Sequence, residues 1–171
     1  MANMIPISTV TVGSGGVANI SFTNIPQIYT DLLIKGSTRR STSSAQGPMI
    51  LNFNGDFGNN YNYRILQGDG ASATTSIASS TSLAYVGQLT GNTATSNTFG
   101  TFDFYIPNYR SSNQKSSCSE AVGEDNITTA VINLVSNNWT GTGPINLITI
   151  TPGSGLIMQY STATLYGIRN Y

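Results

Sequence analysis

The segment between residues 50 and 64 holds most of the side chains that could recognise a ligand. It reads ILNFNGDFGNNYNYR and combines planar amides, one carboxylate and two tyrosines. Amide and carboxylate oxygens can bind calcium, and aromatic faces beside amides can bind a carbohydrate or a protein surface. The candidate binding or interface residues are Asn54, Asp56, Asn59, Tyr61, Tyr63 and, farther along the chain, Trp139.

Charge argues against a metal ion at this segment. Calcium takes about six to eight oxygen ligands, several of them charged, whereas Asp56 is the one carboxylate between residues 50 and 64. The spacing also lacks the alternating acids and the final Glu of an EF-hand loop. Asn54, Gly55 and Asp56 favour turns. The sequence therefore predicts no metal site and no cofactor, and it favours a hairpin turn between strands at 49–54 and 61–67.

The two tyrosines of the segment have more than one use. Period two places Tyr61, Tyr63 and Ile65 on the same face of a strand. Such a pair suits a hydrophobic core or a contact between subunits. Together with Trp139 it also suits a platform for a sugar. The sequence leaves both alternatives open.

Catalytic chemistry finds little support among the residues. The chain has no histidine, which excludes Ser-His-Asp and Cys-His catalysis and the usual zinc ligands. Cys118 is the single cysteine, and its alternating surroundings predict a half-buried structural thiol. Glycoside hydrolysis needs two carboxylates. Asp103, between two phenylalanines, is a candidate buried acid that we expect to pair with Arg64 or Arg110. The sequence predicts a protein that is not an enzyme, with glycan cleavage as a remote third alternative.

Charge is sparse along the whole chain. Seven basic and seven acidic residues give a net charge of zero and make up 8% of 171 residues, against about a quarter in a typical domain. A neutral surface releases few counterions, so we expect no binding to nucleic acid. The first residues lack the features of a secretion signal, and no run is long enough to insert into a membrane. Low charge protects weakly against self-association, so we expect protein partners.

Alternation of apolar and polar residues dominates the chain and predicts roughly ten strands. A Gly-rich turn at 13–16 favours a hairpin between the first two runs. The small polar segment 68–80 is interpreted as a long loop or a flap. The predicted strands cover residues 5–12, 17–22, 29–35, 49–54, 61–67, 82–89, 98–106, 114–122, 128–135, 145–151 and 156–168.

Strand-length runs divided by turns predict an all-β protein, with two packed antiparallel sheets in a jelly-roll-like β-sandwich. We expect one sandwich domain at residues 13–171. Residues 1–12 are expected to form either its first strand or an arm that adds to the sheet edge of a neighbouring molecule. Oligomerisation would cover sheet edges that a sandwich leaves open.

Four segments together resemble a family of small virion proteins encoded by tailed bacteriophages. They are NIPQIYTDL at 24–32, LNFNGD at 51–56, NTFG at 97–100 followed by YIPNY at 105–109, and QYSTATLYGI at 159–168. The resemblance covers most of the chain, from about Asn24 to Ile168, and it brings no catalytic residues with it.

The resemblance implies a structural protein on the exterior of a phage particle that is assembled in the host cytoplasm. Proteins of this kind are typically β-sandwich or jelly-roll modules and commonly homotrimers. One implied role is a capsid decoration, or cement, protein that binds the major capsid protein and stabilises the shell. The alternative is a tail or fibre module that binds a host receptor or a surface glycan.

Overall fold

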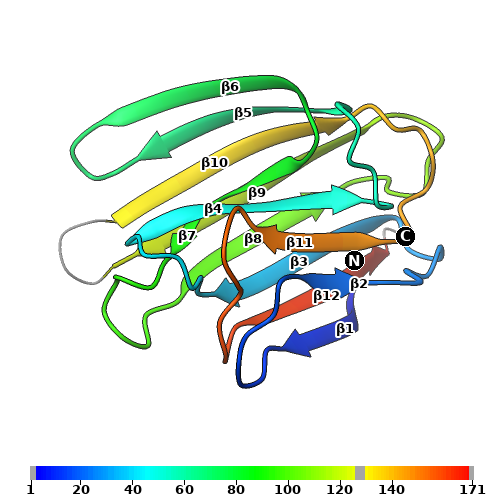
Figure 1. The fold of residues 1–171 in the computed structure, drawn as a ribbon. Coiled ribbons are helices and arrows are strands. Elements are labelled where there is room, and N and C mark those ends of the chain that lie inside the picture. Colours follow the sequence, from blue (N-terminus) through cyan, green and yellow to red (C-terminus); the bar gives the residue numbers. More distant parts are fainter. Residues whose placement is uncertain (1–2, 126–129, 170–171) are drawn as a thin grey trace.

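A computed structural model describes residues 3–125 and 130–169, and this part of the chain is built from strands without any helix (Figure 1). Twelve strands occur in it. They are β1 (Asn3–Thr11), β2 (Ile20–Phe22), β3 (Asp31–Thr38), β4 (Gln46–Phe53), β5 (Tyr61–Gly68), β6 (Ala73–Thr81), β7 (Ala84–Thr90), β8 (Gly100–Ile106), β9 (Lys115–Glu124), β10 (Ala130–Trp139), β11 (Ile148–Pro152) and β12 (Thr162–Arg169).

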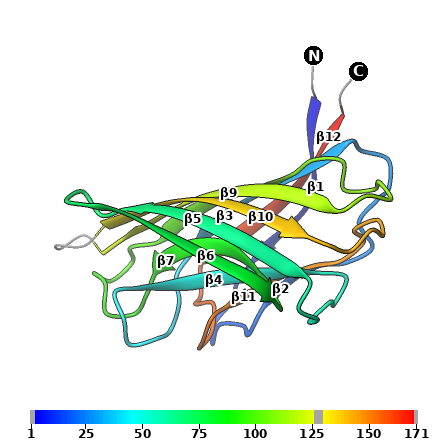
Figure 2. The same cartoon turned by 90° about the horizontal axis from the view of Figure 1, so that it is seen from above.

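The strands form two antiparallel sheets that pack face to face. The large sheet has eight strands in the order β1-β12-β3-β8-β9-β10-β5-β6, and the small sheet has four in the order β2-β11-β4-β7. In Figure 2, β9 and β10 of the large sheet lie above β4 and β11 of the small sheet. The predicted all-β, antiparallel sandwich is therefore confirmed.

Strand pairing is nested around the middle of the chain. β4 pairs with β7, β3 with β8, β2 with β11 and β1 with β12, each time antiparallel. These eight strands behave as one long hairpin that has been folded over so that its strands are shared between two sheets. The pairs β5–β6 and β9–β10 are added to the large sheet only and widen it beyond the small one.

The core lies between the sheets and follows the period-two pattern. In β9 every second residue from Lys115 to Gly123 is buried and the residues between them are exposed, as expected when one face of a strand covers a core. Large apolar side chains from both sheets fill the interior without solvent contact, among them Leu32, Ile34, Leu51, Phe53, Phe104, Ile150 and Leu165.

Both predicted hairpins are wrong. Residues 3–11 pair with β12 and not with β2, so that Met4 lies opposite Ile168. Likewise β4 belongs to the small sheet and β5 to the large one, so the segment between them is a corner that crosses from sheet to sheet. Alternation identifies a strand but carries no information on its partner, and a turn sequence serves a corner as well as a hairpin.

Segment 68–80 was expected to be a loop or a flap, and this prediction is also wrong. Residues Ala73–Thr81 form β6, which pairs with β5 as the edge of the large sheet. Nearly all of β6 is exposed, so its serines and threonines need no apolar alternation. At the other edge, residues 3–11 form β1. Residues 1–2 of the predicted arm and residues 128–129 of the predicted strand 128–135 lie outside the described residues.

Side chains of the large sheet form hydrogen bonds with the backbone groups at the free edge of β7. Asn137 accepts a hydrogen bond from the amide of Tyr85 at 2.9 Å and donates to the carbonyl of Tyr85 at 3.0 Å. Asn133 accepts from the amide of Gln88 at 2.7 Å, and Ser119 donates to the carbonyl of Val86 at 2.7 Å. Both asparagines are buried. They replace the neighbouring strand that an edge strand lacks.

Gly87 allows this close approach of β7 to the large sheet. A Cβ atom at Gly87 would lie 2.3 Å from the Cβ of Ala121, far inside contact distance. The backbone of β7 can therefore reach the asparagine side chains only because position 87 has no side chain.

Replacing Asn137 with Ala should destabilise the fold by about 2–4 kcal/mol, because two buried backbone groups of Tyr85 lose their partner. Urea unfolding of the full chain measures this loss. The matched control is Asn138→Ala, at the next residue of β10, whose half-buried side chain lies on the opposite face; it should change stability by less than about 0.5 kcal/mol. Equal losses in the two variants would contradict the edge role of Asn137.

Candidate functional site

The corner between β4 and β5 brings Asp56, Tyr61 and Trp139 together. Residues 54–60 cross from the small to the large sheet, and Tyr61 begins β5 directly opposite Trp139 at the end of β10. Half of the six candidate residues therefore meet at one end of the sandwich. Their contacts decide whether the corner can bind a ligand.

Asp56 is the polar centre of the corner. Its carboxylate accepts hydrogen bonds from the indole N–H of Trp139 at 2.7 Å, from the amide side chain of Asn60 at 2.9 Å and from the backbone N–H of Gly58 at 2.9 Å. Burial alone would raise the pKa of Asp56, but these three donors outweigh it and hold the pKa below its usual value. The carboxylate is thus ionised and already supplied with partners from this chain.

Tyr61 belongs to the core. Its side chain is fully buried, its hydroxyl accepts from the amide of Phe53 at 2.9 Å, and it donates to the carbonyl of Asp56 at 3.2 Å. Burial raises the pKa of Tyr61 far above its usual value. The ring stacks on Trp139 with centroids 6.4 Å apart. Of the alternatives predicted for the two tyrosines, Tyr61 therefore takes the one of core packing. Its buried ring is not accessible to a sugar.

Trp139 is covered by a lysine that the sequence analysis missed. The ammonium of Lys115 lies 5.8 Å from the centre of the indole ring and donates to the carbonyls of Ser111, at 2.9 Å, and Asn113. Lys115 is almost completely buried, and this burial lowers its pKa. Cation–π contact with Trp139 helps to offset the cost of burying the charge. A lysine at an inward position of an alternating strand is the signal that could have pointed to it.

Asn54 and Asn59 have different roles in the corner. Asn54 adopts a positive φ of 55°; its side chain accepts from the amide of Asn146 at 2.9 Å and donates to the carbonyl of Pro144 at 2.9 Å. It therefore fixes the loop before β11 against the corner. Asn59 is exposed and does not join the group around Asp56.

Tyr63 lies apart from this group, on the inner side of β5 beside β7. Its ring is 5.3 Å from that of Tyr85. Burial and the nearby Tyr63 raise the pKa of Tyr85 to about 12, so its phenol stays protonated at neutral pH. Both rings line a polar groove of about 260 Å³, together with Ile65, Gln67, Thr74, Thr75, Ser76 and Gln88.

Asp103 is not the buried acid, and Cys118 is not the half-buried thiol, that the sequence predicts. Asp103 forms a salt bridge with Lys35 on the outer face of the large sheet, and both side chains are more than 40% exposed. Arg64 and Arg110 instead donate to backbone carbonyls. Cys118 is exposed as well. Both errors have one reason, which is the alternation of the two strands. On β8, Phe102 and Phe104 point inward, so Asp103 between them points outward. On β9, Ser117 and Ser119 point inward, so Cys118 points outward.

Among residues 3–125 and 130–169, no group of three or more His, Cys, Asp or Glu side chains is placed to hold a metal ion. The same part of the chain contains no helix that could cross a membrane. Comparison of the chain with family models, with curated proteins and with solved structures finds no match.

Trp139→Phe should raise the pKa of Asp56 toward the ordinary Asp value of about 4, because it removes the indole donor and keeps most of the ring packing. The pKa of Asp56 is depressed in the folded state. Its charge therefore stabilises the fold above the unfolded pKa, and this stabilisation disappears as the pH falls through the folded pKa. In the variant the loss should begin at a higher pH.

NMR titration of the side-chain carboxyl carbons measures the effect directly. Asp69 serves as the internal control, because its pKa is lowered by the amides of Ser72 and Ala71, far from the indole. An unchanged pKa of Asp56 in Trp139→Phe would contradict its dependence on the indole.

Proposed function

We propose that this protein is a non-enzymatic structural protein on the exterior of a phage particle, and specifically a capsid decoration protein that binds the major capsid protein. In this proposal it is made and assembled in the host cytoplasm, and its work is done by binding energy alone. The resemblance of four segments to virion proteins of tailed phages motivates the placement. The contacts of Asp56, Tyr61 and Trp139 support a role without a reactive centre at the corner, since their polar groups serve the fold.

The observation that carries the proposal is a group of exposed apolar side chains on the outer face of the large sheet. Val122, Ile132, Leu134, Leu66 and Ile77 are 37%, 60%, 51%, 49% and 62% exposed, and we call them the outer apolar patch. They lie on four neighbouring strands, β9, β10, β5 and β6. Contiguous apolar surface on a folded domain marks a contact with another protein. In an assembled shell, a decoration protein contacts neighbouring copies of itself as well as the major capsid protein.

We also infer that the eight nested strands form a jelly roll. The orders β1-β12-β3-β8 and β2-β11-β4-β7 share one folded-over hairpin between two four-stranded sheets, and eight strands in two such sheets define this architecture. In this view β5–β6 and β9–β10 are insertions that extend one sheet. Jelly rolls occur in capsid proteins and in lectins, so the architecture is compatible with both roles discussed here.

A decoration protein should be present in hundreds of copies over the capsid of a phage that encodes it. Quantitative mass spectrometry of purified particles gives the copy number, and labelled antibody seen by electron microscopy gives the location. Adding purified protein to undecorated shells should also raise their disruption temperature as the protein concentration rises, because binding to the intact shell stabilises it by mass action. A few copies at a single vertex, or no effect on bare shells, would contradict the proposal.

The groove beside Tyr63 favours a second candidate function, binding of a host-surface glycan by a tail or fibre protein. The half-buried ring of Tyr63, which packs on the buried Tyr85, supplies an apolar face, and Gln67 and Gln88 supply amides at the same groove. Stacking on rings and hydrogen bonding to amides are how protein surfaces recognise sugars and other polar ligands.

If the groove binds glycan, Tyr63→Ala should weaken binding on a glycan array and adsorption to host cells about tenfold, equivalent to about 1.4 kcal/mol. The matched control is Tyr160→Asn, which removes an exposed tyrosine that does not line the groove; Asn tolerates the positive φ of 70° at that position. Unchanged adsorption in Tyr63→Ala, or an equal loss in Tyr160→Asn, would count against glycan binding.

A further inference from the structure

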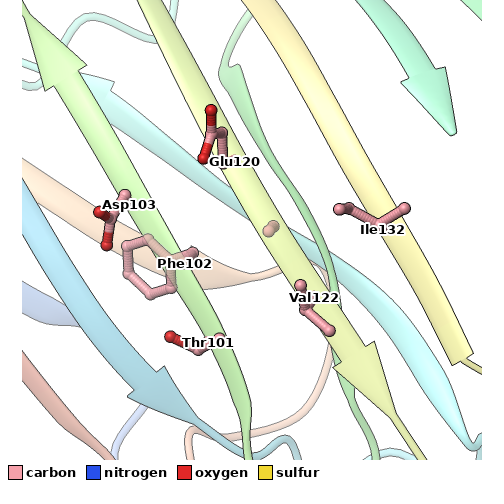
Figure 3. A pocket seen from close by; sticks show the side chains of 7 residues that line it. Thr101, Phe102, Asp103, Glu120, Val122 and Ile132 are labelled. Carbon is pink, nitrogen blue, oxygen red and sulfur yellow. The ribbon is translucent and has the colours of Figure 1, made fainter.

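The outer apolar patch has a regular layout that follows from strand register. Val122 lies opposite Ile132, and in the next row Glu120 lies opposite Leu134, which lies opposite Leu66. Figure 3 shows the β8–β10 side of this surface, with Val122 and Ile132 on neighbouring strands and Glu120 two residues before Val122 on β9. The first two rows therefore bring Val122, Ile132, Leu134 and Leu66 together, with the charged Glu120 at the β9 end of the second row.

A third row completes the surface. Cys118 lies opposite Ser136 on β10, Ser136 lies opposite Arg64 on β5, and Arg64 lies opposite Ile77 on the edge strand β6. Neighbouring strands are about 4.8 Å apart, and outward residues of one strand repeat about every 7 Å. These spacings place every side chain of the surface on a grid.

Two opposite charges lie on different strands of this surface. Glu120 stands on β9, and Arg64 stands on β5 between Ser136 and Ile77, one row away. Among the described residues neither forms an ion pair; the salt bridge of this face joins Lys35 and Asp103. An acidic group on β9 and a basic group on β5 make a surface complementary to itself, because a second copy turned by a two-fold rotation presents the opposite order.

We propose that the outer apolar patch is the contact surface between two copies of this chain, related by a two-fold axis that lies in the interface and passes between Leu134 and Leu66. On the grid, this axis places Leu134 of one copy on Leu66 of the other and Glu120 on Arg64. It also places Val122 near Ile77. Each of these contacts occurs twice, as in any isologous dimer.

The size and charge of the surface set the strength of the dimer. Four strands of about seven residues each cover roughly 450 Å², below the roughly 800 Å² per partner of a standard stable interface. The net charge of zero means that copies do not repel each other at long range. The pairing should therefore be reversible, with a dissociation constant in the micromolar range of about 1–100 µM.

The single cysteine reports on this geometry. Cys118 is exposed beside the patch, and the same axis passes close to it, so that Cys118 of one copy lies near Cys118 of the other. A short bis-maleimide should therefore join two copies through this residue. Cys118→Ser should abolish the cross-link and leave the dimer intact.

The inference deepens the proposed function by naming the partner of the patch, yet it concerns two copies of this chain and is measured without any particle. Sedimentation velocity of the purified full chain over about 1–200 µM should show a monomer–dimer equilibrium. Leu134→Ser should weaken it at least tenfold. Phe57→Ser is the matched control, because Phe57 is 67% exposed at the β4–β5 corner, outside the patch, and it should leave the dimer unchanged.

Charge exchange gives the sharpest result. Glu120→Arg and Arg64→Glu should each weaken the dimer, since each places like charges opposite one another, and the double variant should restore it. A monomer at every concentration, a trimer of the kind implied by the virion resemblance, or a double variant without rescue would overturn the pairing.

Particle copy number tests the proposed function separately. Abundant copies in particles together with a monomeric purified protein refute only the pairing. A dimeric purified protein that is absent from particles refutes only the virion role.

Discussion

The architecture depends on how the edge of β7 finds hydrogen-bond partners. A four-stranded sheet that lies over an eight-stranded one ends in mid-surface, where its edge would leave buried amides and carbonyls without partners. Asn133 and Asn137 on β10 supply them, and Gly87 lets the backbone come close enough. Amide side chains thus take the place of a strand beside β7. The large sheet can therefore extend beyond the edge of the small sheet as β5 and β6, and both faces of this extension lie near solvent.

The need to supply hydrogen-bond partners to β7 also explains why β10 has polar residues on its buried face and apolar residues on its exposed face. Its inner positions include the two asparagines, and its outer positions carry Ile132 and Leu134. Apolar alternation alone would place Ile132 and Leu134 in the core, since they look like the hydrophobic side of the strand. The side that is buried is set by the edge of β7, which comes from a distant part of the chain. Sequence periodicity therefore located the strand correctly and could not say which face would meet solvent.

Sequence reasoning reached the fold class and most strand positions, because apolar alternation and turn residues are local properties. It did not reach strand pairing: Met4 meets Ile168, and Leu51 meets Ile150. At the candidate site, the residue types correctly indicated a cluster of polar and aromatic contacts, but the sequence did not show that these contacts serve the fold. Asp56 and Trp139 hold the crossing between sheets together, a task that uses the same amides, carboxylates and aromatic rings as ligand binding. Lys115 stayed hidden because a buried lysine is rare and its carbonyl partners are set by the folded loop.

The nested pairing of strands affects how the chain folds during and after its synthesis. The innermost pair, β4 with β7, joins nearby parts of the chain, whereas β1 must wait for β12 at the far end. Contacts between such distant segments make folding slow, on the millisecond-to-second scale. Strands β5, β6, β9 and β10 are all synthesised before β12. The apolar outer surface therefore emerges from the ribosome before the sandwich can close, and crowding on a polysome would bring such surfaces together while each chain is still incomplete.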